Sequence, residues 1–184
     1  MKCPSLRLNL ATIEDVDDII EINNSFIEYT TNKGLILSKL ESDQLKNNIF
    51  SNPDYISVAI TSDDTIAGFI ELSFSVDVDV IKKLEWFDEN LRTKFENGKK
   101  LYIEKVAVKS NYQRQNVGKF MYEAIFEKYP EHIFYSFIVK KPFDNIVSLN
   151  FHKKLGFIET AKFKVDEFLG LKNYESVMLM KFLE

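Results

Sequence analysis

The pattern of apolar and polar positions along the chain predicts its strands. Residues 5–11 alternate in this way and suit a strand with one buried face. The segments 55–60 and 66–74 flank the polar turn Ser62–Asp64, a pattern typical of an antiparallel hairpin. Residues 101–108 are rich in β-branched and aromatic residues and predict a further strand. The nearly continuous apolar run 133–139 predicts another, and two final strands are expected over residues 157–163 and 176–183.

Apolar residues spaced three and four apart predict the helices. The first begins after Thr12, which can cap it together with Asp15 three residues on. A short second helix is expected near residues 42–50. A third runs from Val117 until Pro130 ends it, and a fourth covers residues 144–155 and closes at Gly156.

Residues 76–98 interrupt this pattern. Val76–Val80 alternates like a strand, whereas residues 81–95 have the spacing of a mostly helical insertion that ends at Gly98. The resulting order of strands and helices predicts an α+β or α/β layered protein with a mixed sheet.

Composition narrows the class of protein. The 184 residues are 45% hydrophobic, and no Pro-rich or Ser/Gly-rich linker divides them, so one domain is expected. A net charge of −4 with scattered basic residues argues against nucleic acid as a partner. The single cysteine favours a reducing cytoplasm, and one Cys with two His makes a zinc cluster implausible, so no metal is expected. No apolar run approaches the roughly 18 residues of a membrane helix, so no membrane association is expected.

The turn at residues 112–118 is the first chemical feature. It joins a predicted strand to a helix start, where unpaired N–H groups and the helix dipole favour an anion. Gln113 and Arg114 add side-chain donors, Lys119 adds charge, and Gly118 lets a ligand approach the backbone closely. Without further context, this composition also fits an ordinary polar turn.

The second feature is a polar stripe on the helix near residue 144. Asn145, Ser148 and His152 fall on one face beside Leu149 and Leu155. A bound ligand would satisfy these polar groups. An alternative is that Asn145 caps the helix, Ser148 bonds its own backbone and His152 faces solvent.

Together these two segments resemble the GNAT superfamily of acetyl-CoA-dependent N-acetyltransferases. Residues 106–118 are similar to the family's V-x-V strand followed by Q/R-x-x-G-x-G/A, with Asn116 in the place of the first glycine. Asn tolerates a left-handed backbone well, so the departure is mild. Residues 145–157 resemble the second motif, N-x-x-(A/S)-x-x-F-Y-x-x-x-G-F, with His152 replacing Tyr.

This resemblance implies one GNAT-like domain over residues 1–184, with a mixed, mostly antiparallel central sheet of about seven strands flanked by helices. It also implies acetyl-CoA as the acetyl-donor cosubstrate, with Asn145 binding the pantetheine arm or a nearby backbone group. The residues expected to bind it are Val106, Ala107, Val108, Gln113, Arg114, Gln115, Asn116, Val117, Gly118, Lys119, Asn145, Ser148, Phe151 and His152.

Direct acetylation of an amine needs a base, a polarised carbonyl and a proton for the thiolate. Glu104 is the expected base, because it shares a strand face with Val106 and Val108 and the resemblance places an acid there. An edge-strand Glu paired with a nearby Lys is the alternative. His152 is the expected proton donor, unless it only binds while Tyr102, Tyr122 or water donates.

The acceptor is expected to be a primary amine of a small molecule or peptide. The resemblance places its pocket near residues 23–37 and near Trp86 and Phe87, and Asp77 and Asp79 would favour a cationic amine. A GNAT-like acyl-CoA sensor without turnover is the main competing hypothesis. A nucleotide site is a weaker one, because the glycine-rich nucleotide motifs are absent. The sequence leaves monomer and homodimer equally open.

Overall fold

The computed structural model describes residues 5–27, 34–75 and 77–183. It contains two compact units. The first comprises residues 1–28, 38–72 and 104–130, and the second comprises residues 29–37, 73–103 and 131–184. The strand β5 (Lys99–Val108) contributes its first half to the second unit and its last half to the first.

The first unit is built on the strands β1 (Leu6–Leu10), β2 (Ile56–Thr61) and β3 (Ile66–Ser73). β1 pairs antiparallel with β2, and β2 pairs antiparallel with β3, which confirms the predicted hairpin. The last half of β5 lies beside β3. There Gly68 is required, because a Cβ at this position would stand 2.5 Å from the carbonyl oxygen of Ala107.

Its helices are α1 (Val16–Asn24), α2 (Ser42–Ser51) and α5 (Val117–Lys128), with short 3-10 turns η1 (Ile13–Asp15) and η2 (Ser110–Tyr112). As the capping pattern predicted, the backbone N–H of Thr12 donates to the Asp15 carboxylate at 2.7 Å. Each helix contributes the apolar face expected from its spacing to the core of the unit, through Val16, Ile19, Ile22, Leu45, Ile49, Val117, Met121 and Ile125.

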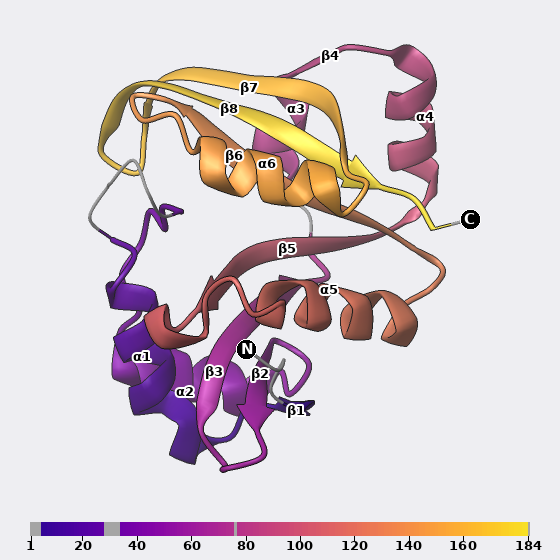
Figure 1. The fold of residues 1–184 in the computed structure, drawn as a ribbon. Coiled ribbons are helices and arrows are strands. Elements are labelled where there is room, and N and C mark those ends of the chain that lie inside the picture. The colour runs from indigo at the N-terminus through magenta and orange to yellow at the C-terminus, as the bar shows by residue number, and fades with distance from the viewer. Residues whose placement is uncertain (1–4, 28–33, 76, 184) are drawn as a thin grey trace. The chain divides into compact units, whose positions relative to one another are not determined.

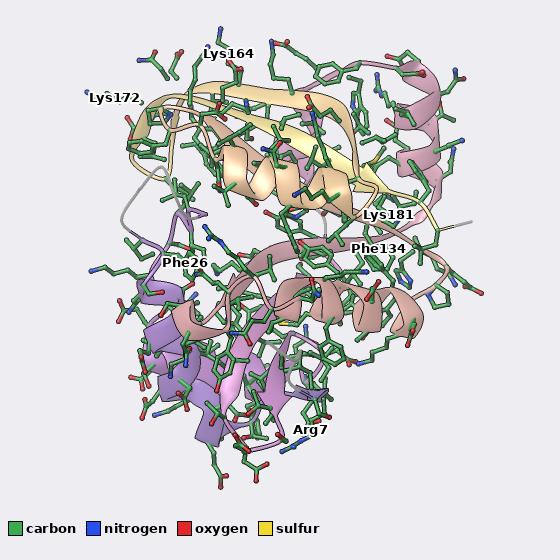
Figure 2. All side chains as sticks on the ribbon, viewed as in Figure 1. Arg7, Phe26, Phe134, Lys164, Lys172 and Lys181 are labelled. Carbon is green, nitrogen blue, oxygen red and sulfur yellow. The ribbon has the colours of Figure 1, made fainter. Side chains whose placement is uncertain are left out.

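The second unit is organised around β6 (His132–Lys141), β7 (Ile158–Phe168) and β8 (Leu171–Lys181). β8 pairs antiparallel with both β6 and β7, and the first half of β5 pairs parallel with β6. Figure 1 shows α6 (Ile146–Lys154) in front of β6 and β8, and α3 (Val78–Lys82) behind these strands. Lys164 and Lys172 point outward from the long β7–β8 hairpin (Figure 2), so both lysines are exposed.

The insertion at residues 77–98 forms α3, β4 (Leu84–Trp86) and α4 (Glu89–Asn97). β4 extends the sheet beside β7, and apolar side chains of all three elements pack into the core of the unit. Phe95 is 1% exposed, and its ring centroid lies 5.1 Å from that of Tyr135 and 5.5 Å from that of Trp86. The aromatic residues of the insertion therefore close the core of the second unit.

The strand predicted for Val76–Val80 is wrong over the described residues 77–80. The Asp77 carboxylate accepts hydrogen bonds from the backbone N–H groups of Asp79 and Val80, at 3.0 and 3.1 Å. Asp77 is thus an N-cap, and the chain turns into α3. Val76 lies outside the described residues.

The hydrogen-bonded strand order is β1-β2-β3-β5-β6-β8-β7-β4. The predicted α+β class with a mixed, mostly antiparallel sheet and flanking helices is confirmed, and the unpredicted strand β4 raises the number of strands from about seven to eight. That residues 1–184 form a single domain stays a prediction. None of the described helices is long and apolar enough to cross a membrane.

Candidate functional site

The backbone between β5 and α5 forms a tight turn within the first unit. Arg114 and Asn116 have φ angles of 60° and 63°, and Asn116 is the left-handed N-cap of α5. The tolerance of Asn for this conformation accounts for its place where glycine was expected. The first hydrogen bond inside α5 runs from the Phe120 N–H to the Asn116 carbonyl, at 2.9 Å. The N–H groups of the preceding first turn are therefore available to an anion.

Two glutamine side chains in this turn form hydrogen bonds to nearby backbone carbonyls. Gln113 Nε2 donates to the carbonyl of Val108 at 3.2 Å, and Gln115 Nε2 donates to the carbonyl of Asn111 at 2.7 Å. The bond of Gln113 to Val108 ties the turn to the end of β5, and the predicted role of Gln113 as a donor to a ligand stays a prediction. Arg114 and Lys119 are exposed, and Lys119 pairs with Glu123 at 3.5 Å.

Glu104 lies on β5 within a cluster of charged groups in the first unit. The Lys105 ammonium is 2.8 Å from Glu71 Oε2 and 3.7 Å from Glu104 Oε1. The Glu71 side chain is fully buried and that of Lys105 is 9% exposed, whereas that of Glu104 is 38% exposed. Tyr55 donates its hydroxyl hydrogen to the Glu71 carboxylate. Of the three charged side chains, that of Glu104 is therefore the most accessible to water.

The surroundings of Glu104 favour its protonated form. Burial raises the pKa of its carboxyl group and the negative charge of Glu71 raises it further, while Lys105 acts in the opposite direction. A raised pKa brings a carboxylate closer to the range in which it accepts a proton efficiently near neutral pH. The alternative prediction was a Glu104 that pairs with a nearby lysine. Lys105 is such a neighbour, but it lies closer to Glu71 than to Glu104.

Glu71, Lys105 and Tyr55 were not among the predicted site residues. The one available signal was Glu71 itself, a charged residue inside the apolar run 66–74, because charged residues are rarely buried without a partner. Its partner could not be identified, because Lys105 is 34 residues further along the chain.

In the second unit, Asn145 fixes the start of α6. Its Oδ1 accepts from the Ser148 N–H at 3.3 Å, and its Nδ2 donates to the Leu35 carbonyl at 3.3 Å. Asn145 is 6% exposed, so these bonds satisfy a buried amide. Asn145 therefore caps α6, as the alternative prediction stated, and its Nδ2 bond also links α6 to the segment before α2.

His152 is 2% exposed and packs within the second unit. Its Nδ1 lies 2.8 Å from the Ser148 carbonyl, which can only accept, so Nδ1 carries the hydrogen. The ring also meets those of Phe151 and Phe157 edge-on, at centroid distances of 5.7 and 5.2 Å. Burial lowers the pKa of His152 to about 4, so the imidazole is neutral at pH 7. The solvent-facing alternative for His152 is wrong, and proton donation by it stays a prediction.

Most described polar residues of the predicted acceptor region support local structure. Asn23 is fully buried and its Nδ2 donates to the Ser38 carbonyl at 3.1 Å, while Ser25 Oγ donates to the Ile22 carbonyl at 2.7 Å. Asp77 caps α3, and Asp79 lies 3.9 Å from the Lys82 ammonium. Residues 28–33 of this region lie outside the described residues.

Comparisons with known proteins agree with this fold. The model of the acetyltransferase (GNAT) family matches residues 19–157. The structure of yncA from Salmonella typhimurium, solved with its cofactor acetyl-CoA, has a TM-score of 0.67 at 14% identity, covering 98% of this chain and 95% of that one. Ribosomal-protein-alanine N-acetyltransferase from Brucella melitensis has a TM-score of 0.66 at 17% identity, covering 96% and 99%.

A third similar structure is Naa50 from Arabidopsis thaliana in complex with the bisubstrate analogue CoA-Ac-MVNAL. Its TM-score is 0.64 at 14% identity, and the match covers 96% of this chain and 98% of that one. No curated protein matches the sequence.

The fold defines the class first, an α+β protein with the GNAT arrangement of strands and helices. Because the family model covers most of the chain, the protein belongs to the GNAT acetyltransferase family. It is therefore an N-acetyltransferase that uses acetyl-CoA as its acetyl donor.

Proposed function

We propose that this protein transfers the acetyl group of acetyl-CoA to a primary amine of a small molecule or peptide by direct attack. The observation that carries this proposal is the continuity of β5 and the turn that follows it. Within one unit, the strand bearing the accessible carboxylate Glu104 leads directly into a turn whose left-handed Asn116 opens a helix.

The turn before α5 suits the pyrophosphate of acetyl-CoA. N–H groups of the first turn of α5 and the positive end of its dipole would bind the phosphate oxygens. Gly118 lacks a Cβ and leaves room for this approach, and the exposed Arg114 and Lys119 add positive charge. The hydrogen bonds made by Gln113 and Gln115 hold the backbone in place for this role.

Asn145 retains hydrogen-bonding capacity for the pantetheine arm. Its amide group has two N–H donors, one of which is directed at Leu35, and its oxygen has a second lone pair beside the one that accepts from Ser148. We extend the same role to the α6 residues Ser148 and Phe151, and to the strand residues Val106, Ala107 and Val108 around the thioester.

In the proposed reaction, Glu104 accepts a proton from the amine as its nitrogen attacks the thioester carbonyl carbon. A carbon–nitrogen bond forms, the carbon–sulfur bond breaks, and the departing thiolate takes up a proton. A backbone N–H at Val106–Val108 would polarise the carbonyl. The raised pKa of Glu104 strengthens it as a base.

We infer that His152 binds and positions rather than donates the proton. With a pKa of about 4, only about one molecule in a thousand carries an imidazolium at pH 7. The Nδ1 hydrogen is also engaged by Ser148, so the neutral ring has no second hydrogen to give. This leaves Tyr102, Tyr122 or water as the acid.

The experiment that tests the function measures thiol release from acetyl-CoA with polyamines, amino acids, aminoglycosides and peptides as acceptors. Acetylated product identified by mass spectrometry is the expected result for at least one acceptor class. Naa50, which has a similar fold, was solved with the bisubstrate analogue CoA-Ac-MVNAL, so the panel of acceptors should include peptides with a free N-terminus. A preference for cationic acceptors would support a contribution from Asp79.

The competing hypothesis is an acyl-CoA sensor without turnover, because His152 and Asn116 depart from the family motifs. A thermal shift with acetyl-CoA reports binding in both cases, since a ligand that binds the folded state alone raises its apparent stability. Binding without product over the whole panel would favour the sensor. The same measurement with ATP tests the nucleotide alternative.

A further inference from the structure

Lys105 lies between two carboxylates in the first unit and serves them unequally. Its ammonium is 2.8 Å from Glu71 Oε2, within hydrogen-bond range, and 3.7 Å from Glu104 Oε1, beyond it. Lys105 therefore forms ion pairs with both carboxylates, but only the shorter one, with Glu71, is a hydrogen bond.

Burial explains why Lys105 prefers Glu71. The Glu71 side chain is fully buried, so its carboxylate depends on protein donors, whereas water reaches Glu104 through its 38% exposed side chain. A buried charge that loses its partner is strongly disfavoured. The Tyr55 hydroxyl donates to the other oxygen of Glu71 and holds that carboxylate in place.

We propose that Glu71 is a positioning residue for Glu104, because it holds the Lys105 ammonium on its own carboxylate and so keeps the longer Lys105–Glu104 ion pair from shortening to a hydrogen bond. A hydrogen-bonded pair would stabilise the Glu104 carboxylate further and weaken it as a base. Glu71 from β3, Lys105 from β5 and Tyr55 before β2 thus form a fixed set around Glu104. The consequence for catalysis rests on the proposed function, in which Glu104 is the base.

This role predicts the order in which variants move the titration of Glu104. In Glu71→Gln, Lys105 is released toward Glu104, so the Glu104 titration midpoint falls below that of the wild type. In Lys105→Met, the only positive charge of the cluster is lost and the midpoint rises. The double variant Glu71→Gln with Lys105→Met lies above Glu71→Gln, because no ammonium remains to pair with Glu104.

Carbon-detected NMR of protein labelled at the glutamate side-chain carboxyl measures this midpoint in the full chain without requiring turnover. Asp64→Asn is the matched control: it removes the same charge from the β2–β3 turn, where Asp64 pairs with Arg7, and leaves the Glu104 midpoint unchanged. Asn also tolerates the φ of 58° at that position.

The double-mutant cycle decides whether Glu71 acts through Lys105. The proposal requires Glu71→Gln to shift the midpoint more when Lys105 is present than in the Lys105→Met background. Equal shifts in both backgrounds, or no shift in either, would overturn it. Should Glu71→Gln fail to fold, Glu71→Asp replaces it: its shorter carboxylate loosens the hold on Lys105, and an unchanged Glu104 midpoint would count against the proposal.

The dependence of kcat/KM on pH separates this inference from the proposed function. If Glu104 is the base, the acidic limb of the profile moves to lower pH in Glu71→Gln together with the NMR midpoint. A midpoint that moves while the acidic limb stays in place supports the role of Glu71 and removes Glu104 as the base.

Discussion

Two titratable side chains were expected to act as a pair, and burial affects them in opposite ways. At Glu104, burial and the charge of Glu71 raise the carboxyl pKa and make the group a better base. At His152, burial lowers the imidazole pKa to about 4 and removes the charged form that would donate a proton. Burial favours the neutral form in both cases. It therefore favours a carboxylate as a base, and it lowers the population of the charged histidine that would act as an acid.

The two regions also differ in how their polar groups are satisfied. Around Glu104, a tyrosine hydroxyl, two carboxylates and an ammonium form a charged cluster. Around His152, the partners are neutral: a backbone carbonyl and two phenylalanine rings. The first region thus contains several charged groups close together, whereas the His152 hydrogen bond in the second links neutral groups within one helix.

The largest expected effect is that of Glu104→Gln. Removing the base should lower kcat for acetyl transfer by about 10²–10⁴-fold, equivalent to roughly 3–5 kcal/mol, while acetyl-CoA binding is retained. Steady-state kinetics and calorimetric binding measure the two quantities. Glu127→Gln, an exposed glutamate of α5, is the control and should match the wild type. An unchanged kcat in Glu104→Gln would show that Glu104 is not the catalytic base.

The second prediction concerns the stability of His152 variants across pH. Below pH 6.5 the unfolded chain binds a proton at His152 that the folded chain refuses until about pH 4, so stability falls as the pH falls through this window. Over the whole window the loss is about 3 kcal/mol. His152→Asn keeps a donor for the Ser148 carbonyl but does not titrate, so it should lack this part of the loss.

Urea unfolding at pH 8, 6 and 4 checks this prediction, with pH 8 as the reference for each protein. Parallel pH dependence in wild type and His152→Asn would show that the histidine titrates normally in the folded state. The same variant should retain acetyl transfer within about tenfold if His152 is not the acid.

A smaller effect is expected at Asn145. Asn145→Ala removes both the cap on α6 and the bond to Leu35, and should cost about 1–2 kcal/mol of stability. Asn145→Asp keeps the acceptor for the Ser148 N–H but loses the donor to Leu35, so it should fall between the wild type and the alanine variant. Denaturant midpoints measure both. Equal losses in the two variants would assign the whole effect to the Leu35 bond.

The smallest expected effect is at the turn before α5. Asn116→Val forces a β-branched residue into a left-handed conformation and should cost about 1 kcal/mol, whereas Asn116→Gly should be neutral or slightly better. The melting temperature measures the loss of stability, and KM for acetyl-CoA shows whether the turn still binds its ligand. A valine variant equal to the glycine variant in both would mean that the turn does not need this conformation.

Local patterns predicted much of the fold and of the turn. The hairpin, the helix starts at Thr12 and Val117 and the left-handed Asn116 depend on neighbouring residues, so the sequence reveals them. The strand predicted for Val76–Val80 was wrong because an alternating pattern also fits one helical turn, and Asp77 caps the helix that begins at Val78.

The parts that could not be predicted depend on pairing between distant segments. Glu71 meets Lys105 only because β3 and β5 become neighbours, and His152 becomes neutral only because the second unit buries it. Periodicity reports which face of an element is apolar but not which partner covers it. The pKa values of both candidate residues therefore required the three-dimensional structure.

The short strand β4 has a consequence for how the protein behaves in concentrated solution. It spans only Leu84–Trp86, pairs with β7 through Ala161–Phe163, and its Glu85 forms an ion pair with Lys162 at 2.9 Å. A short, charged strand at the end of a sheet offers little template for another chain to extend. Without the insertion, the eleven-residue β7 would itself become that edge. The insertion therefore also guards the sheet against edge-to-edge aggregation.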